Sequence, residues 1–409
     1  MKTRALGHLI AFSLAVATAG CGDEAPFSND NGDLYSLNQD LLFSSLPPDA
    51  IPALTLPDMV AADEVGAEYL FDFDRVLGVV VEGEARAYPH NILWHHEILN
   101  DRIGDTWISA TFCPLTGSGV VFDPFVDGTR LDLGVSGLLF ANNLIMYDRI
   151  SGAVYGPQLS VEGKCATFRD TSVGVRAVHE MSWGRWKELY PDTKVVAGDT
   201  GFPRNYRSYP YGSYDQITSS DLLFPMSAVD TSRPIKERVL AIRIGDGGRG
   251  YPFGELRESG EAAALNALVG RVPTAVFCES RDGETALAFD ARLGGQTLSF
   301  TVSEGGTWTD AETGSTLTID GSSIGGPMEG ERLTTRSSSS GSHGDTSSPP
   351  GTRSSSEARH PGPLRRGSSA RRGGDLLAAG GPLASRQGEL LDEGLVLSSL
   401  DHGAVPGER

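Results

Sequence analysis

The sequence has few basic residues and almost no long apolar run. Its 34 Lys and Arg residues are outnumbered by 53 Asp and Glu residues, which gives a formal charge of −19 over 409 residues. A surface this acidic repels phosphate backbones, so nucleic acid is not expected as a partner. The only stretch apolar enough to enter a membrane lies at the N-terminus, which excludes a protein with several membrane spans.

The chain nevertheless contains enough apolar material for a folded core. Hydrophobic residues make up 39% of the chain and aromatic residues 8%, which excludes a wholly disordered protein. The length indicates two or three domains. The acidic excess lies within residues 21–330, where it favours a solvated, soluble surface.

The first twenty residues have the pattern of an export signal. Lys2 and Arg4 form a short positive region, and Leu6 to Ala19 is mostly apolar but too short to span a bilayer comfortably. The apolar stretch ends in Thr18-Ala19-Gly20-Cys21. Small residues directly before a cysteine resemble the signal of bacterial lipoproteins.

This resemblance implies cleavage before Cys21 and attachment of lipid to its sulfur, so the membrane is the expected partner. Gly22, where other such signals have aspartate, implies sorting to the outer membrane of a Gram-negative bacterium. Residues 1–20 are then the signal peptide, and residues 21–50, rich in Asp, Asn, Ser and Pro, are a lipidated tether in the cell envelope. The alternative is an ordinary signal peptide that happens to contain a cysteine.

Three cysteines remain once Cys21 is assigned to the lipid. Cys113, Cys165 and Cys278 are an odd number, so at least one thiol is unpaired within the chain even in an oxidising compartment. This leftover thiol is the first indication of chemistry in the sequence.

Two stretches of the chain repeat one pattern. Residues 77–90 and 240–253 both read as a β-branched strand, a tight glycine turn and a second strand that ends in Arg-x-Tyr-Pro. Further matches follow in the same order: Thr111-Phe112-Cys113 with Val276-Phe277-Cys278, Val121-Phe122-Asp123 with Ala288-Phe289-Asp290, Leu133-Gly134-Val135-Ser136 with Phe300-Thr301-Val302-Ser303, and Asp148 with Asp310. We therefore predict two tandem copies of one unit, 66–200 and 233–332, joined by a connector, 201–232, in one pseudo-symmetric domain.

Alternating and β-branched segments predict a mainly β fold with short helices, of the α+β class. The expected strands are 76–81, 106–112, 118–126, 130–136, 143–148, 239–244, 273–278, 285–290, 296–302 and 315–319. Proline at the first turn and the helical spacing of apolar residues predict a helix from Pro89 to Leu99. Trp183, Trp186 and Leu189 predict a second short helix from Ser182 to Leu189.

The composition changes to Ser, Gly, Pro and Arg near Thr334, so residues 333–409 have the composition of a low-complexity tail. The first copy closes with a segment that contains Trp183 and Trp186, and the second copy never reaches its equivalent. If the serines at 337–340 are TCN codons, the neighbouring reading frame encodes apolar residues and then two codons that can both be Trp, at the same spacing. A frameshift near Thr334 is therefore an alternative to a genuine disordered tail.

The stretch richest in reactive side chains runs from His90 to Glu97 and is followed by Cys113, which precedes a Pro-Leu-Thr-Gly turn. Imidazole, carboxylate and thiolate are all metal ligands, and Cys with His suits zinc or copper. On a helix His96 faces the core, where a cysteine at a strand end can meet it. His96 and Cys113 are therefore candidate metal ligands, although no close ligand pair such as Cys-x-x-Cys is present.

A second interpretation makes Cys113 a catalytic nucleophile, with His96 as its base and Glu97 as a more distant orienting group. A hydrogen-bonded structural histidine and a buried structural cysteine are the alternatives. His96 and Glu97 lie opposite Ser and Gly in the second copy, so any active site is expected in the first copy. Cys278 lies opposite Cys113, which leaves open a structural role or a disulfide between the two.

A polar group and a tyrosine-rich loop supply candidate binding residues. Asn142, Asp148 and Arg149 follow the predicted strand 130–136, although an aspartate beside an arginine is usually a structural ion pair. Tyr211 and Tyr214 belong to a loop in which tyrosines alternate with arginine and proline. Such a loop can line a pocket for a sugar or peptide, or it can simply connect the two copies.

Several motifs of the sequence are informative when taken together: Arg86-Ala87-Tyr88-Pro89, His96-Glu97-Ile98-Leu99-Asn100-Asp101, Thr111-Phe112-Cys113-Pro114-Leu115-Thr116-Gly117, Val135-Ser136-Gly137-Leu138-Leu139, Met146-Tyr147-Asp148-Arg149, Tyr209-Pro210-Tyr211-Gly212-Ser213-Tyr214 and Ile235-Lys236-Glu237. Jointly they resemble the DUF3179 family, whose members are largely uncharacterised exported prokaryotic proteins. The resemblance assigns residues 51–332 to a DUF3179-like region and implies no reaction. Many members have Cys-Pro-Leu-Cys where this chain ends the motif in Thr116, which argues against an obligatory Cys-x-x-Cys redox pair here. Members also continue with a Trp-rich segment after the second copy.

Two functional hypotheses follow. The first is a lipid-anchored envelope protein with a metal- or thiol-dependent site built from His96, Glu97 and Cys113, either enzymatic or metal-carrying. The second is a non-catalytic binding lipoprotein whose aromatic loop recognises an envelope ligand.

Overall fold

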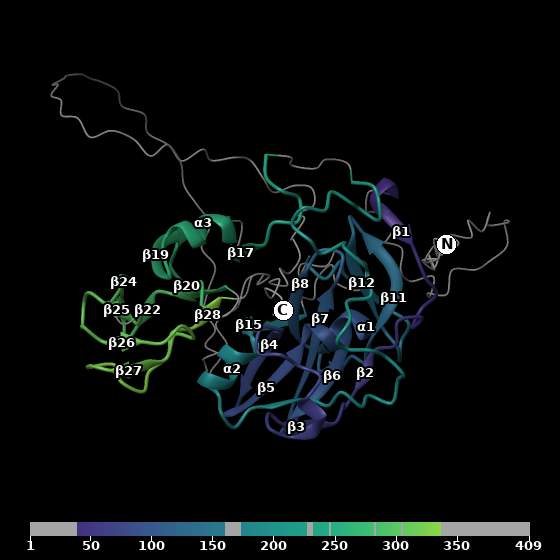
Figure 1. The fold of residues 1–409 in the computed structure, drawn as a ribbon, viewed down its shortest axis with the longest axis horizontal. Helices are drawn as coiled ribbons and strands as arrows, with labels where there is room; N and C mark the ends of the chain where they lie inside the picture. The colour runs from purple at the N-terminus through teal and green to yellow at the C-terminus, as the bar shows by residue number, and fades with distance from the viewer. Residues whose placement is uncertain are drawn as a thin grey trace, which may run out of the picture.

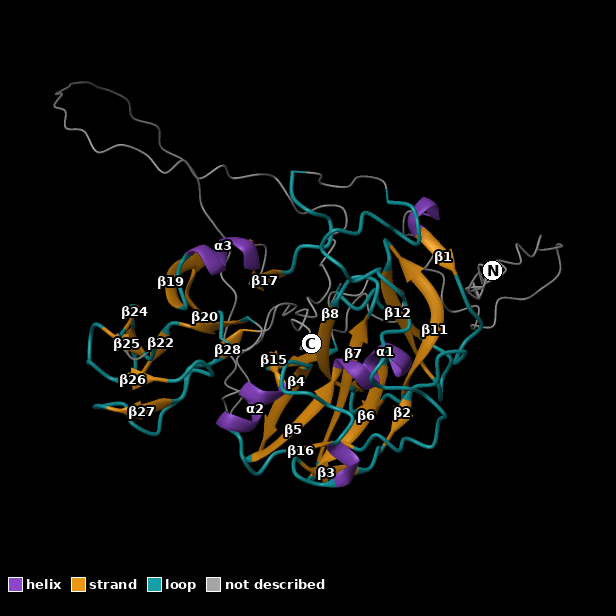
Figure 2. Ribbon diagram, viewed as in Figure 1, coloured by secondary structure: helices purple, strands orange, loops and turns teal. Residues whose placement is uncertain are grey.

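The structure is a computed structural model, and it describes residues 39–159, 173–226, 232–244, 247–281, 284–303 and 306–336. Within these ranges strands far outnumber helices (Figure 2). The helices are α1 (His90–His96), α2 (Trp183–Leu189) and α3 (Phe253–Glu258), with 3-10 turns at Gln39–Leu41 and Val65–Ala67. The predicted mainly β class with short helices is confirmed. None of the described helices is long and apolar enough to cross a membrane.

The first half of the described chain, purple to teal at the right of Figure 1, forms three main sheets. The first sheet contains, in spatial order, β15 (His179–Ser182), β4 (Arg75–Val81), β5 (Glu84–Pro89), β16 (Lys194–Val196) and β3 (Met59–Ala61). The second contains β14 (Gly174–Arg176), β8 (Ser118–Asp123), β7 (Thr106–Cys113), β6 (Ile98–Ile103) and β2 (Leu54–Thr55). The third contains β1 (Leu42–Ser44), β11 (Leu133–Phe140), β12 (Asn143–Asp148) and β13 (Val154–Tyr155), and a separate short hairpin consists of β9 (Phe125–Val126) and β10 (Thr129–Arg130).

The second half, green to yellow at the left of Figure 1, has smaller sheets. It begins with the hairpin β17 (Val239–Ile244) and β18 (Gly247–Pro252). One four-stranded sheet contains β19 (Ala262–Val269), β20 (Val272–Glu279), β21 (Thr285–Asp290) and β28 (Thr335–Arg336), and the other contains β24 (Phe300–Val302), β25 (Trp308–Asp310), β26 (Thr316–Leu317) and β27 (Ser323–Gly325). The short hairpin β22 (Arg292–Leu293) and β23 (Gln296–Thr297) lies between them in the chain. Both halves therefore run through a hairpin, a helix, a meander, a short hairpin and a second meander.

Apolar side chains fill the space between the layers of the first half. Leu77, Tyr88 and Leu93 belong to a core between the β4–β5 hairpin, α1 and the β6–β8 sheet. A separate core, which includes Val120 and Ile145, joins β6–β8 to β11–β13. Because the central sheet is covered on both faces, the end of β7 lies well inside the protein.

Helix α2 joins the two halves. Trp183 and Trp186 lie in one apolar core with Phe277 and Phe289 of the second half. Trp186 is fully buried and lies directly over Gly78 of β4, where an added Cβ would come within 2.3 Å of the indole ring. The glycine therefore provides the space that this tryptophan needs.

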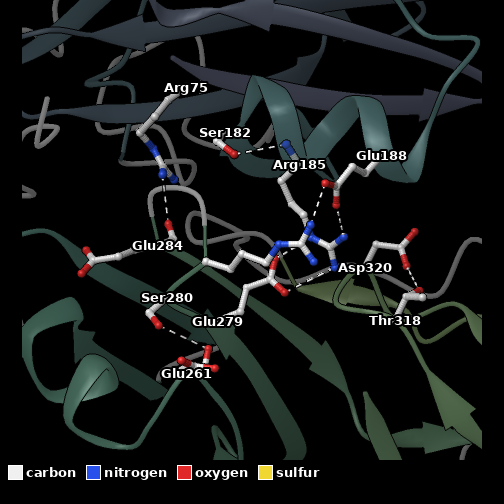
Figure 3. Close-up of polar contacts among 11 residues, drawn as sticks. Arg75, Ser182, Arg185, Glu188, Glu261, Glu279, Ser280, Glu284, Thr318 and Asp320 are labelled. Atoms are coloured by element: carbon white, nitrogen blue, oxygen red, sulfur yellow. Dashed lines mark hydrogen bonds and ion pairs between the residues drawn. The ribbon is translucent and has the colours of Figure 1, made fainter. Parts of the chain in front are cut away.

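Ion pairs cross the same boundary (Figure 3). Arg185 of α2 pairs with Glu279 of β20 at 2.7 Å and with Glu188 of its own helix at 2.8 Å. Arg75 of β4 donates to the carbonyl oxygen of Glu284 at 3.0 Å. The pair of Arg185 and Glu279 is largely buried, so its loss should weaken the contact between the halves more than the loss of an exposed pair would.

One predicted helix is shorter in the structure and three predicted strands are divided. The strands expected over 130–136 and 296–302 are split between β10 and β11 and between β23 and β24. The helix expected from Pro89 to Leu99 ends at His96, because Glu97 adopts φ 57° and the chain then enters β6. The strand expected over 118–126 divides into β8 and β9 at Pro124, which has no N–H to donate to a strand ladder.

Candidate functional site

Cys113 is the last residue of β7 and is buried, with 1% of its surface exposed. Its thiol donates to the main-chain oxygen of Asn142 at 3.4 Å. Asn142 adopts φ 63° in the turn that joins β11 to β12, so this turn presents its carbonyl group to the sulfur. Burial, followed by the charge of Glu97, raises the pKa of the thiol to about 11. In this arrangement the thiol is held in its protonated form.

Glu97 is the first residue after α1 and supplies the acid of the site. Its main-chain N–H donates to Leu93 at 2.8 Å, and its carbonyl oxygen accepts from Phe112 of β7 at 2.8 Å. The side chain is buried, and burial raises the pKa of the carboxyl to about 8 although the hydrogen bond from Tyr211 opposes this shift. The carboxyl therefore holds its proton through most of the neutral range.

His96 is fully buried, but its ring is turned toward other groups than Cys113. Its Nδ1 lies 2.7 Å from the carbonyl oxygen of Pro52, and its Nε2 lies 2.6 Å from the hydroxyl of Tyr206. Burial lowers the pKa of the imidazole to about 4. The predicted roles of His96 as a metal ligand or as the base for Cys113 therefore have no support in this geometry, and its contacts are those of a positioning residue.

Tyr206, Tyr209, Tyr211 and Tyr214 belong to a loop, residues 197–226, that covers the end of β7. Tyr206 and Tyr214 are buried, and the other two rings pack against the core around Cys113. Asn142 fixes the far end of the loop, because it donates to the carbonyl oxygen of Phe224 at 3.0 Å and accepts from its N–H at 3.1 Å. The aromatic rings thus face the core, which removes the basis for an open aromatic pocket in the predicted loop.

Lys236 is a site residue that the sequence analysis did not single out. It is 2% exposed, and its ammonium lies 3.1 Å from the ring centroid of Tyr214. Burial lowers the pKa of this amine to about 8, against the opposing effect of Asp221 and Asp215. Among the described residues its Nζ has no hydrogen-bond partner. Lys236 belongs to the motif Ile235-Lys236-Glu237, and this motif is the sequence signal that could have found it.

A buried polar network supports the turn after Cys113. Thr116 and Ser118 share a hydrogen bond of 2.8 Å, Ser118 donates to Gln158 at 2.9 Å, and Gln158 donates to Thr111 at 2.8 Å. Asn143 donates to Thr116 at 3.0 Å. Thr116 therefore has a structural role in fixing the end of β7.

The other two candidate binding residues lie in a tight turn and not with the thiol. Asp148 accepts from the hydroxyl of Ser151 at 2.6 Å and from the N–H of Asp132 at 2.8 Å. Arg149 pairs with Asp132 at 3.0 Å and donates to the hydroxyl of Thr55. These contacts favour the structural interpretation of both residues over a binding role.

The remaining predictions for this site concern metal and disulfide chemistry. No group of three or more His, Cys, Asp and Glu side chains within the described ranges is arranged to hold a metal ion. Cys113 and Cys278 are both free and buried, so the alternative of a disulfide between them is wrong. Cys21 and Cys165 lie outside the described residues.

The fold and the site define a layered β protein with a thiol and a carboxylic acid enclosed beneath a tyrosine loop. The chain belongs to the family described as protein of unknown function DUF3179, whose model matches residues 48–341. The predicted resemblance to this family is therefore confirmed. No curated protein and no solved structure matched the sequence.

Proposed function

We propose that this protein is an exported, lipid-anchored envelope protein that acts through the thiol of Cys113, with Glu97 as the group that accepts and returns its proton. His96 positions the covering loop through Tyr206 in this proposal. The lipoprotein signal at Cys21 supports the location, and the enclosed pair of thiol and carboxyl supports the chemistry.

The observation that carries the proposal is the backbone of Glu97. Helix α1 ends at a residue with a positive φ, and this residue is Glu97, with φ 57°. After α3 the positive φ belongs to Gly260, which adopts φ 115° without a side-chain penalty. A non-glycine residue at such a position costs about 1 kcal/mol or more, and burying a carboxyl there adds to the cost. Strain and an unfavourable burial at one residue are typical of a functional site.

The chemistry that the pair supports is proton transfer coupled to attack by sulfur. In the fraction of molecules in which Glu97 is ionised, its carboxylate accepts the thiol proton as Sγ forms a bond to an electrophilic atom of the ligand. The bond between that atom and the leaving group breaks, and the neutral acid then gives the proton to the leaving group. A carboxyl with a pKa of about 8 can exchange its proton near neutral pH. Because the tyrosine loop excludes water, the loop must move before a ligand reaches the sulfur.

Alkylation rates measured cysteine by cysteine test this proposal. Cys278 is the matched control, because burial raises the pKa of its thiol to about 11 as well. We expect Cys113 to react with iodoacetamide faster than Cys278, and Glu97→Gln to slow Cys113 at least about tenfold while Cys278 is unchanged. Equal rates at the two cysteines, with no effect of Glu97→Gln, would show that Cys113 is structural.

The predicted duplication is also part of the proposal, and matched contacts support it. Asn100 of β6 clamps the main chain of Leu133, donating to its carbonyl at 2.8 Å and accepting from its N–H at 3.3 Å. Asn266 of β19 clamps Phe300 in the same way, with both distances 2.9 Å. A common ancestral unit explains why two asparagines make the same pair of bonds in sheets far apart in the chain.

The envelope location is tested separately from the chemistry. We expect the wild-type chain to fractionate with the outer membrane and Cys21→Ser to be released from it, since the lipid is attached through that sulfur. Retention of Cys21→Ser in the membrane would contradict the lipid anchor and would leave the thiol chemistry unaffected.

A further inference from the structure

The correspondence between the two halves continues up to Arg336. In the first half, β14 pairs with β8, and Arg176 forms an ion pair with Asp123 at 3.4 Å. In the second half, β28 pairs with β21 in the same antiparallel sense, and Arg336 forms an ion pair with Asp290. Arg176 and Arg336 therefore occupy the same place in the two halves.

The first half continues beyond this point with elements that cover its hairpin. Strand β15 begins three residues after Arg176, and its four residues pair with Arg75 to Gly78 at the outer edge of β4. Helix α2 follows directly, and its Trp186 packs over Gly78 of β4. As a result every residue of β4 except Val80 is buried.

The hairpin of the second half lacks this cover among the described residues. There β17 pairs with β18 and with no other strand. Four of its six residues are only partly buried, among them Val239, Leu240 and Ile244. An open strand edge with apolar side chains is a ready template for another strand.

We propose that the outer edge of β17 is a docking site for one more strand followed by a tryptophan-bearing helix, the counterparts of β15 and α2. The occupant is the polypeptide that codons 336–344 encode in the neighbouring frame. If the serines at 337–340 are TCN codons, that frame encodes apolar residues for a strand and then two codons compatible with tryptophan at the spacing of Trp183 and Trp186. The family match ends at residue 341, close to where the counterpart of β15 would begin. This inference does not depend on the chemistry of Cys113.

The test begins with the gene. A single inserted base in codon 336 restores the frame, provided that the serines at 337–340 are TCN codons. The restored chain is compared with the present full-length chain by thermal unfolding and by hydrogen exchange of β17, with β4 as the internal reference. A control carries serine in place of both restored tryptophans.

We expect the restored chain to melt at least about 5 °C higher, as a newly packed helix and strand would give. We also expect the β17 amides to gain at least about tenfold protection while those of β4 are unchanged, and the control to lose most of the gain. A synthetic peptide with the restored sequence should protect β17 of the present full-length chain in trans, which covers the case of a restored chain that folds poorly. The proposal would be overturned if the serine codons are not TCN or introduce a stop codon into the neighbouring frame. Unchanged hydrogen-exchange protection of β17 in both experiments would also overturn it.

Discussion

Cys113 and Cys278 are both buried near the end of a strand, β7 and β20, yet their surroundings differ. Cys113 lies near an acid, Glu97, and a tyrosine that hydrogen-bonds it, all beneath the loop 197–226. The Cys278 thiol donates to the main-chain oxygen of Ala263 at 3.8 Å, and its neighbouring acid, Glu279, forms an ion pair with Arg185. Its surroundings include a shallow pocket lined by Phe253, Leu256, Arg257, Glu279, Ser280 and Thr285.

This difference shows that the cysteine alone does not make the site. Both halves have a buried thiol near the end of an inner strand of a sheet. A purely structural role for the cysteine would explain this shared feature. The first half differs in two respects. Glu97 follows α1, whereas Gly260 has the positive φ after α3, and the tyrosines of the loop 197–226 cover the end of β7. The chemistry proposed for Cys113 therefore depends on its neighbours, and variants of matched residues in the two halves can test this dependence.

The largest effect is expected from the helix that only the first half possesses within the described residues. Trp186 is fully buried in the core shared by the halves, and its indole N–H donates to Thr193 at 2.8 Å. Trp186→Ala should lower the free energy of unfolding by about 4 kcal/mol, because a large cavity opens. Chemical denaturation measures this loss. A loss under about 1 kcal/mol would show that α2 is not needed to hold the halves together.

The second prediction concerns the pH dependence of stability. The pKa of Glu97 is raised from its usual 4.5 to about 8, so between these values the unfolded chain releases a proton that the folded chain keeps. Stability should therefore fall as pH rises through this window. His96 and His179, whose pKa values burial lowers to about 4, act in the opposite direction but only below about pH 6.5.

The range from pH 6.5 to 8 therefore isolates Glu97. Across it the wild-type protein should lose about 2 kcal/mol of stability, while Glu97→Gln should show a nearly flat profile. Lys236, whose pKa burial lowers to about 8, influences stability mainly above this range. Denaturation midpoints at several pH values provide the measurement, and parallel profiles for the two proteins would contradict the buried acid.

The sequence predicted the strands best where apolar alternation is uninterrupted. The expected strands 143–148 and 239–244 match β12 and β17 residue for residue. Helix α1 is overextended in the prediction, because the pattern of apolar residues continues past Glu97 into β6. Helical periodicity cannot reveal a residue that turns left-handed, so this boundary depends on the tertiary contacts of Glu97.

The site was predicted in part for a similar reason. Glu97, a candidate residue, interacts with the Cys113 thiol and with Tyr211, since the acid lies directly before β6 and the thiol at the end of the neighbouring strand β7. The roles predicted for His96 have no support in its contacts, because its two hydrogen bonds reach Pro52 and Tyr206, which are distant in the sequence. Residue types predict which side chains can react, whereas the long-range packing decides which of them meet.

The third prediction compares the two asparagine clamps. Asn100 is buried and also accepts from Ser109 at 2.7 Å, whereas Asn266 is exposed. Asn100→Ala should lower the free energy of unfolding by about 2 kcal/mol or more, because buried main-chain groups of Leu133 lose their partners. Asn266→Ala should cost about 1 kcal/mol or less, since water replaces the lost bonds. Equal losses would show that burial does not distinguish the clamps.

The smallest effects are expected from the two ion pairs that mark the end of the correspondence. Arg176 and Asp123 are both partly exposed, so Arg176→Ala should change the free energy of unfolding by less than about 0.5 kcal/mol. Asp290 is better buried, and hydrogen bonds from Arg292 and then Arg336 overcome its burial and lower its pKa to about 2.

Arg336→Ala should therefore cost somewhat more, about 1 kcal/mol, because a buried carboxylate loses one of its two cations. The stabilising contribution of Asp290 is present above its usual pKa of 3.8 and is lost as pH falls through about 2, so the difference between the two variants should narrow in acid. Urea denaturation at pH 7 and at low pH measures both quantities. If the two substitutions lower the free energy of unfolding equally at pH 7, the ion pair of β28 stabilises the protein no more than that of β14. The second half would then not depend on its last described strand.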